Sequence, residues 1–199
     1  MILDSGIESI LKCWNILSSH DTPRIKNLIP DPELRKIALI LQFTLPGAPV
    51  IYYGEELGMS GKDDPCNRGP MEWNLVNEEN EYLKFYKKLI DLKKKNISLQ
   101  YGDFLALDTS ETLAFCRQTN NLEDLIVVIV NPGEKEVREI ISIPEYRLMN
   151  WEKMEDKFSG NKFSIFCGLI NITIPPKSCY ILSPIIPSKE GYSPYKRIK

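Results

Sequence analysis

The chain has 199 residues, of which 43% are hydrophobic and 26% charged, a composition typical of globular rather than disordered or fibrous proteins. Its 25 basic and 27 acidic residues give a net charge of −2, so no positive surplus favours nucleic acid or an anionic membrane as a partner. No apolar run reaches the roughly 18 residues that a membrane-spanning helix needs. The length allows one ordinary domain or two small ones.

Cysteine usage bears on metal binding and on the cellular compartment. The five cysteines form no CxxC pair, and the chain has a single histidine, so we expect no bound metal. We expect free, mostly buried thiols, as in a reducing compartment, and therefore a cytoplasmic location. The first residues carry no basic segment ahead of an apolar one, so no secretory signal is predicted.

The first 96 residues alternate helix-like and strand-like segments. Residues 7–12 are predicted to end a helix, and the apolar run 13–17 is predicted to form a buried parallel strand. A second helix is predicted to start at Asp31-Pro32-Glu33, which combines a capping Asp, a Pro at the first helical position and an acidic first turn. Pro46-Gly47 is predicted to end this helix.

A second strand and a long loop follow this helix. Residues 49–53 are predicted to form another buried strand, and residues 55–77 form a polar loop of a length that is uncommon unless it has a function. The period of the apolar residues predicts an amphipathic helix over residues 79–96. The first half is therefore an α/β arrangement with long loops after its strands.

The sequence changes character after Asn96. Short apolar runs separated by Gly, Asn, Pro and Glu predict an antiparallel β-sandwich over residues 97–186. Its strands are expected at residues 99–107, 113–117, 125–130, 137–143, 162–166, 170–174 and 179–182. The tail, residues 187–199, is predicted to be disordered.

Polar side chains follow both predicted parallel strands, where ligand-binding residues gather in parallel α/β folds. Ser19-His20-Asp21 follows the first strand, while Glu55, Asp64 and Arg68 follow the second. Carboxylates accept hydrogen bonds from hydroxyls, and arginine donates in a fixed fork, so this set suits a polyhydroxylated ligand. The plainer interpretation is a structural His–Asp pair and an exposed loop ion pair.

Three segments taken together, LSSHDTPRI, QFTLPGAPVIYYGEELGMSG and DDPCNRGPMEW, resemble the last part of the catalytic barrel in the α-amylase superfamily, glycoside hydrolase family 13. The most similar group is that of the neopullulanases, cyclomaltodextrinases and maltogenic amylases. The resemblance covers residues 10–73. It implies that residues 1–96 are the last two strands of a (β/α)8 barrel with their helices, and that an all-β sandwich follows.

The resemblance also implies roles for individual residues. Asp21 would be the third carboxylate of the family's site, which binds sugar hydroxyls and helps to distort the ring toward an oxocarbenium-like transition state. His20 would bind the same sugar, while Asp64 and Arg68, which match a DPxxR pattern, would hold the next glucose. Glu55 receives no role. No cofactor is implied; some amylases bind calcium, but no calcium-loop pattern is present.

Retaining glycosidases need a nucleophile and an acid/base about 5–5.5 Å apart. The family carries these two groups on earlier barrel strands, so we expect the chain to be inactive alone. Its expected partners are an α-glucan oligosaccharide and an N-terminal barrel portion, and its open barrel face favours self-association. Three hypotheses stay open: a truncated α-glucan hydrolase, half of a split enzyme, and a non-catalytic glucan-binding or interaction module.

Overall fold

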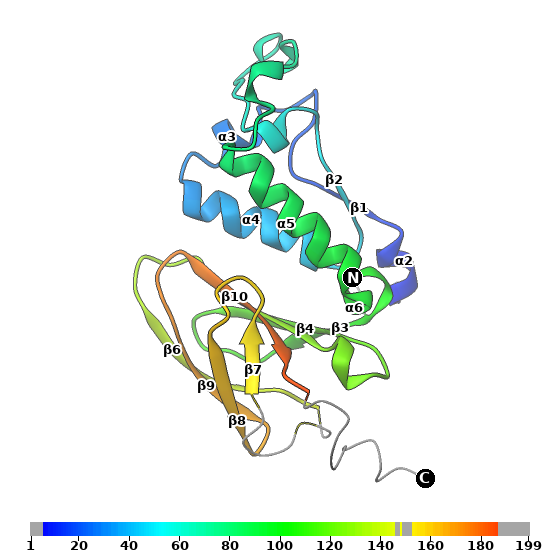
Figure 1. The fold of residues 1–199 in the computed structure, drawn as a ribbon, viewed down its shortest axis with the longest axis vertical. Helices are drawn as coiled ribbons and strands as arrows, with labels where there is room; N and C mark the ends of the chain where they lie inside the picture. Colours follow the sequence, from blue (N-terminus) through cyan, green and yellow to red (C-terminus); the bar gives the residue numbers. More distant parts are fainter. Residues whose placement is uncertain (1–5, 146–147, 149–152, 187–199) are drawn as a thin grey trace. The chain divides into compact units, whose positions relative to one another are not determined.

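The structure is a computed structural model that describes residues 6–145, 148 and 153–186 (Figure 1). The chain divides into two compact units, residues 1–102 and 103–199. This division falls six residues after the predicted domain boundary at Asn96, because the short helix α6 lies with the first unit. The predicted domain boundaries themselves stay a prediction. The tail predicted to be disordered, residues 187–199, lies outside the described residues.

The first unit consists of helices and two short parallel strands (Figure 1). Strands β1 and β2 pair in parallel, with Asn15 opposite Pro49, as expected. The elements, in order, are α2 (Ile7–Leu11), β1 (Trp14–Ile16), α3 (Ile25–Leu28), α4 (Pro32–Thr44), β2 (Ala48–Val50), three 3-10 turns (Glu55–Leu57, Cys66–Arg68, Trp73–Leu75), α5 (Glu81–Lys95) and α6 (Ile97–Tyr101).

Helix α4 begins as its sequence predicts. The Asp31 side chain accepts hydrogen bonds from the backbone N–H groups of Glu33 and Leu34, at 2.9 and 3.1 Å, which satisfies two free donors of the first turn. The helix is buried on more than one side, because Ile37 and Phe43 are both almost fully inaccessible to solvent. Helix α4 therefore forms the core of the first unit and connects the two parallel strands.

Strand β1 is exposed, which contradicts the prediction of a buried strand at residues 13–17. Trp14 is 71% exposed and Ile16 is 48% exposed. Among the described residues β1 has one neighbour, β2, so its other edge carries unpaired backbone groups. The apolar side chains of Trp14 and Ile16 are therefore not covered by the described part of the chain.

The second unit is an antiparallel, nearly closed sheet. Its eight strands follow the order β3-β4-β5-β10-β7-β8-β9-β6. They are β3 (Asp103–Leu107), β4 (Leu113–Gln118), β5 (Ile126–Asn131), β6 (Val137–Ser142), β7 (Lys153–Asp156), β8 (Lys162–Phe166), β9 (Leu169–Ile174) and β10 (Ser178–Pro184). The prediction of an antiparallel all-β unit is confirmed, although one continuous sheet replaces the two sheets of a sandwich.

The core of the second unit lies inside this sheet. Every residue of β5 is buried, and buried Ile141, Ile165 and Ile170 from other strands belong to the same apolar cluster. The first predicted strand, residues 99–107, is wrong at its start, because Leu99 lies in helix α6 and the strand begins at Asp103.

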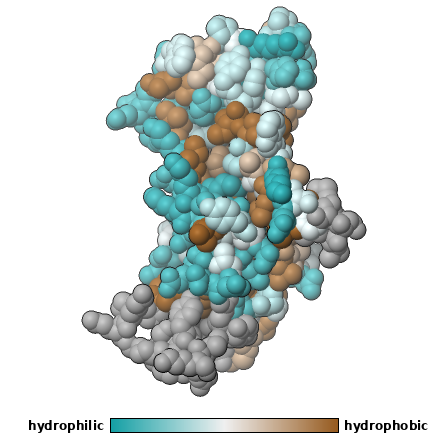
Figure 2. Space-filling model, turned by 90° about the vertical axis from the view of Figure 1, so that its right-hand side faces the viewer, coloured by the Kyte–Doolittle hydropathy of each residue, from teal (hydrophilic) through white to brown (hydrophobic). Residues whose placement is uncertain are grey.

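Three of the five cysteines are exposed, which contradicts the expectation of mostly buried thiols. Cys13, Cys66 and Cys167 are exposed, and none of the five cysteines, all of which are described, forms a disulfide. Figure 2 shows one face of the molecule, on which hydrophobic side chains form small groups between hydrophilic ones. Across the described part of the chain, no helix is both long and apolar enough to cross a membrane.

Candidate functional site

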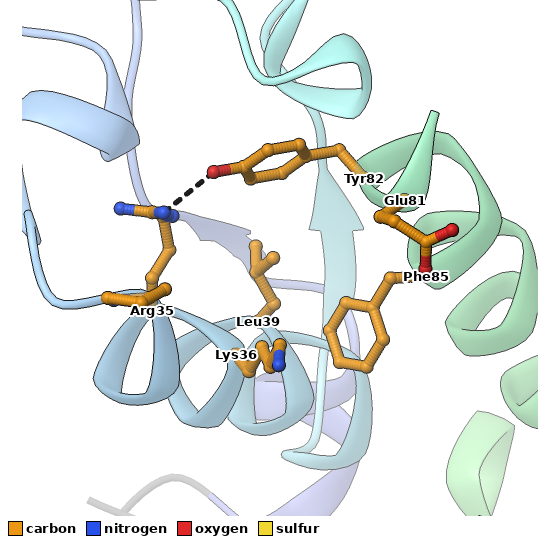
Figure 3. A pocket seen from close by; sticks show the side chains of 7 residues that line it. Arg35, Lys36, Leu39, Glu81, Tyr82 and Phe85 are labelled. Carbon is orange, nitrogen blue, oxygen red and sulfur yellow. Dashed lines mark hydrogen bonds between the residues drawn. The ribbon is translucent and has the colours of Figure 1, made fainter. Parts of the chain in front are cut away.

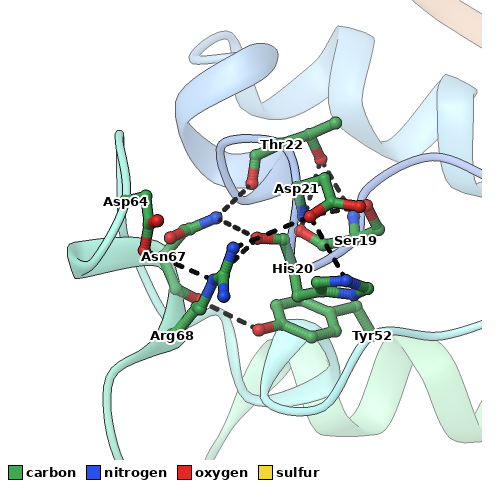
Figure 4. Close-up of polar contacts among 8 residues, drawn as sticks. All are labelled: Ser19, His20, Asp21, Thr22, Tyr52, Asp64, Asn67 and Arg68. Atoms are coloured by element: carbon green, nitrogen blue, oxygen red, sulfur yellow. Dashed lines mark hydrogen bonds and ion pairs between the residues drawn. The ribbon is translucent and has the colours of Figure 1, made fainter.

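The loops that follow β1 and β2 meet in one pocket. Because the two strands are parallel, their carboxyl ends share an edge of the sheet. The four predicted site residues, His20, Asp21, Asp64 and Arg68, all line this pocket, which has a volume of about 210 Å³ (Figure 4). Side chains more than 40 residues apart in the sequence are thus brought together.

Asp21 and Arg68 are at the centre of a small network of polar contacts. Asp21 Oδ1 lies 3.2 Å from His20 Nε2 and 3.6 Å from Arg68 Nη2. Arg68 Nε lies 3.3 Å from Asp64 Oδ1. The four side chains are 46–70% exposed, so these ion pairs add little to stability and remain accessible to a ligand.

The turn that presents His20 and Asp21 is closed by its own hydroxyl groups. The Thr22 hydroxyl accepts a hydrogen bond from the Ser19 N–H at 2.9 Å, and the Ser19 hydroxyl accepts one from the Asp21 N–H at 3.1 Å. These bonds satisfy backbone donors within the turn, as Ser and Thr commonly do in loops. The imidazole and the carboxylate are therefore left to project toward the pocket.

A buried arginine supports the base of both loops. The Arg24 side chain is fully buried, and its guanidinium lies 4.8 Å from the ring centres of both Tyr52 and Tyr53. Its Nη1 donates to the Tyr53 carbonyl oxygen at 2.6 Å. A guanidinium stacked on two rings is a stable cation–π arrangement, so Arg24 fixes the end of the second strand relative to the first loop.

Glu55, for which the sequence indicated no role, connects the two loops from below. Its carboxylate is buried and accepts hydrogen bonds from the Ser18 hydroxyl at 2.8 Å and from the Ile25 N–H at 3.2 Å. Burial raises the pKa of Glu55 above its usual value, although these hydrogen bonds and the nearby Arg24 act in the opposite direction. Glu55 is therefore a structural support rather than a group that faces a ligand.

Sequence reasoning also missed Asn67, which is 1% exposed and lines the pocket. Its side-chain N–H groups reach the backbone of the first loop, at His20 and Thr22. The sequence signal was its place inside the DPxxR pattern, one position before Arg68. Within the described residues, no three His, Cys, Asp or Glu side chains are arranged to hold a metal ion.

A second pocket of about 210 Å³ lies between helices α4 and α5 (Figure 3). Pro32, Leu39 and Phe85 contribute apolar walls, and the Tyr82 hydroxyl already accepts a hydrogen bond from Arg35 at 2.7 Å. The pocket's charged residues also have partners already, Lys36 with Glu33 and Glu81 with Lys84, which leaves few free polar groups for a polyhydroxylated ligand. The pocket at Asp21 is the candidate functional site.

Comparison with known proteins places this site in a family. Residues 5–78, which contain both strand-end loops and all four predicted site residues, match the family described as "Alpha amylase, catalytic domain". The segment that carries the site is therefore similar to the catalytic domain of the α-amylase family.

The relatives share the names expected from the sequence. The chain is 40% identical over 126 residues to a cyclomaltodextrinase of Thermoanaerobacter pseudethanolicus, covering 62% of this chain and 22% of that protein. It is 33% identical over 173 residues to neopullulanase 2 of Thermoactinomyces vulgaris, covering 85% and 29%. The chain thus spans only about a quarter of the length of these two relatives.

Solved structures show the same fold. Ttha1563 from Thermus thermophilus matches with a TM-score of 0.70 and 30% identity, over 85% of this chain and 35% of that one. A maltogenic amylase from S. marinus matches with a TM-score of 0.66 and 33% identity, over 84% and 22%. The antiparallel second unit matches the C-terminal β-domain of an amylase.

Proposed function

We propose that the chain is the C-terminal part of a retaining α-glucan hydrolase. Residues 1–96 would supply the last two strands of its (β/α)8 barrel, and the antiparallel unit would follow as its C-terminal domain. The parallel pairing of β1 and β2 around helix α4, and the family match of residues 5–78, support this assignment. The names of the relatives support α-glucans as the substrate class.

One observation carries the proposal: two separate loops bring His20, Asp21, Asp64 and Arg68 into one pocket. Asp21 would accept hydrogen bonds from sugar hydroxyls that strengthen as the ring flattens toward an oxocarbenium-like transition state. His20 would donate to hydroxyls of the same sugar. Arg68, held beside Asp64, would bind the next glucose through its fixed fork of donors.

The nucleophile and the acid/base of such an enzyme would come from segments other than these residues. Without them the chain keeps binding groups but loses nearly all rate acceleration. We therefore expect no hydrolysis of β-cyclodextrin or pullulan by the 199-residue chain alone. Hydrolysis by the purified chain would contradict this part of the proposal, provided that a mock preparation shows none.

A chimera tests the role of Asp21. This chain replaces the 173 aligned residues of the Thermoactinomyces vulgaris neopullulanase 2, and hydrolysis of β-cyclodextrin is measured. We expect an active chimera in which Asp21→Asn lowers kcat by roughly 10²- to 10³-fold, the range for one preorganised transition-state contact. Asp108→Asn is the control, since it removes an exposed carboxylate that does not line the pocket and leaves the contacts of Asp21 and Arg68 intact.

A chimera with equal activity in both variants would show that Asp21 is not the third carboxylate. The alternative function is a non-catalytic glucan-binding or interaction module. It is favoured by one observation, that the polar pocket is assembled within the chain itself. Maltodextrin binding by the lone chain, together with an inactive chimera, would support that alternative over the hydrolase.

A further inference from the structure

The two strand-end loops are joined by direct hydrogen bonds at both ends of their contact. At one end, the Arg24 N–H donates to the Gly61 carbonyl at 2.9 Å, and the Gly61 N–H donates to Asn27 Oδ1 at 2.7 Å. A Cβ at Gly61 would lie 2.5 Å from the carbonyl oxygen of Cys66, so glycine is needed here for the second loop to fold back on itself. The backbone of Gly61 therefore holds the bases of the loops together, through one bond to the backbone of Arg24 and one to the side chain of Asn27.

At the other end the contact depends on one side chain. Asn67 Nδ2 donates to the His20 carbonyl oxygen at 2.8 Å and to the Thr22 carbonyl oxygen at 3.0 Å (Figure 4). These two carbonyls belong to the residues on either side of Asp21. A single buried amide thus holds the backbone just before and just after the carboxylate.

The orientation of this amide is fixed by its partners. Both partners are carbonyl oxygens, so a flipped amide would place Asn67 Oδ1 against two acceptors. In the observed orientation, Oδ1 is buried and meets no donor among the described residues. Leaving a buried acceptor unsatisfied costs free energy, so the two bonds donated by Nδ2 must offset the cost of the unsatisfied Oδ1.

Arg68 also contacts the first loop but cannot replace Asn67. Its Nε donates to the His20 carbonyl oxygen at 3.1 Å while lying 3.3 Å from Asp64 Oδ1, and its side chain is 46% exposed. Exposed ionic contacts are weak and are exchanged for water or ligand. The buried amide of Asn67 is the contact that persists when Arg68 moves.

We propose that Asn67 is a positioning residue that holds Asp21 in reach of His20 and Arg68. The inference deepens the proposed function, because Asp21 is the group whose place it sets. Asn67 is 1% exposed, and both donors of its amide are used by backbone carbonyls rather than left for a ligand. It acts through the backbone on both sides of Asp21.

The chain offers a probe that needs no substrate. His20 is the only histidine among the 199 residues, so its imidazole gives one resolved set of NMR signals. Its Nε2 lies 3.2 Å from Asp21 Oδ1, and a displaced loop changes the surroundings of this ring. We expect Asn67→Ala and the isosteric Asn67→Asp, which removes both donors, to shift the His20 signals of the folded chain.

Asn77→Ala is the matched control, because Asn77 is another loop asparagine whose amide bonds are local: Nδ2 donates to the Asn74 carbonyl oxygen and Oδ1 accepts from the Glu79 N–H. We expect it to leave the His20 signals unchanged. If Asn67→Ala does not fold, Asn67→Ser retains one hydroxyl donor and is expected to fold with a smaller shift. Unchanged His20 signals in a folded Asn67 variant would overturn the proposal.

The active chimera supplies a kinetic readout. A misplacement of about 1 Å costs up to about 10²-fold in rate, so we expect Asn67→Ala to lower kcat by roughly 10- to 100-fold, with a smaller change in KM. An unchanged kcat with shifted His20 signals would also overturn the positioning role. If the chimera is inactive but the Asn67 variants of the 199-residue chain still shift the His20 signals, the result would count against the proposed function. The positioning role of Asn67 would still be supported.

Discussion

At the scale of single residues, Glu139 shows how a fold stabilises a charge. Its carboxylate accepts hydrogen bonds from the N–H groups of Ser110, Glu111 and Thr112 at 2.9–3.3 Å, and from the hydroxyls of Ser110 and Thr112. Burial opposes ionisation of this group, but the hydrogen bonds outweigh it and lower the pKa of Glu139. The carboxylate therefore fixes the turn between β3 and β4.

Replacement of Glu139 by Gln is expected to lower the free energy of unfolding at pH 7 by about 1–3 kcal/mol, the cost of lost bonds to a charged acceptor. Because the folded-state pKa is lowered, the contribution is complete above the unfolded pKa of about 4.3 and is lost as pH falls through the folded value. Urea unfolding at pH 7 and at pH 3 measures the difference.

Glu136→Gln, at an exposed position just before β6, is the control for this substitution. It removes one negative charge without touching the turn, so we expect little change at either pH. A stability loss in Glu139→Gln of the same size at pH 7 and pH 3 would contradict an ionic contribution. No loss at all would contradict the role of the turn.

At the scale of elements, the end of helix α4 is held by a lysine from helix α5. Lys93 Nζ donates to the carbonyl oxygens of Phe43, Gly47 and Leu99, at 3.2, 3.0 and 2.9 Å. The last carbonyls of a helix lack partners within it, and a cation there also interacts favourably with the helix dipole. Lys93 thus joins the end of α4, the turn before β2 and helix α6.

Lys93→Met keeps the apolar stem and removes the ammonium group, so we expect a loss of about 1–3 kcal/mol in the free energy of unfolding. Thermal and urea unfolding of the full chain measure the loss. Lys94→Met, at the next and exposed position, is the control and is expected to change stability by less than about 0.5 kcal/mol. Equal effects of the two substitutions would contradict the capping role.

Helices α4 and α5 could be predicted from local rules, because their signals are local. Asp31 caps α4 as expected, and α5 starts two residues after the predicted position because Asn80 caps it. Leu99 was misassigned to a strand because α6 depends on contacts made elsewhere. The Lys93 ammonium binds the Leu99 carbonyl oxygen, and the Gln100 amide binds backbone carbonyls in α5.

The candidate site could be predicted only in part. His20, Asp21, Asp64 and Arg68 stand in recognisable segments, and their functional roles stay predictions. Asn67 was missed because its partners are backbone carbonyls 45 and 47 residues away, and every residue has a carbonyl. Which loop meets which is a tertiary property that spacing along the chain does not encode.

At the scale of the whole molecule, the two units differ in how complete they are. The apolar cluster of the second unit is built entirely from its own strands and turns, between Leu107 and Leu182. The first unit has a sheet of two strands and exposes Trp14 and Ile16. The second unit thus has the closed core that an independent domain needs, whereas the first leaves an apolar strand uncovered.

We therefore expect a chain of residues 103–199 to fold alone. Its circular dichroism should report β-structure that is lost in one cooperative urea transition, with the same midpoint at all protein concentrations. A chain of residues 1–102 is expected to associate with rising concentration, because its exposed strand edge accepts another strand. Gradual unfolding of the 103–199 chain would contradict a self-sufficient core.

The joined loops after β1 and β2 also bear on how the gene that encodes them can evolve. The pocket side chains, and the amide that connects their loops, are all encoded between His20 and Arg68. A gene rearrangement that moves this one stretch transfers the four predicted site residues together with the bonds that orient them. Recombination between related genes can therefore exchange this pocket as a heritable unit.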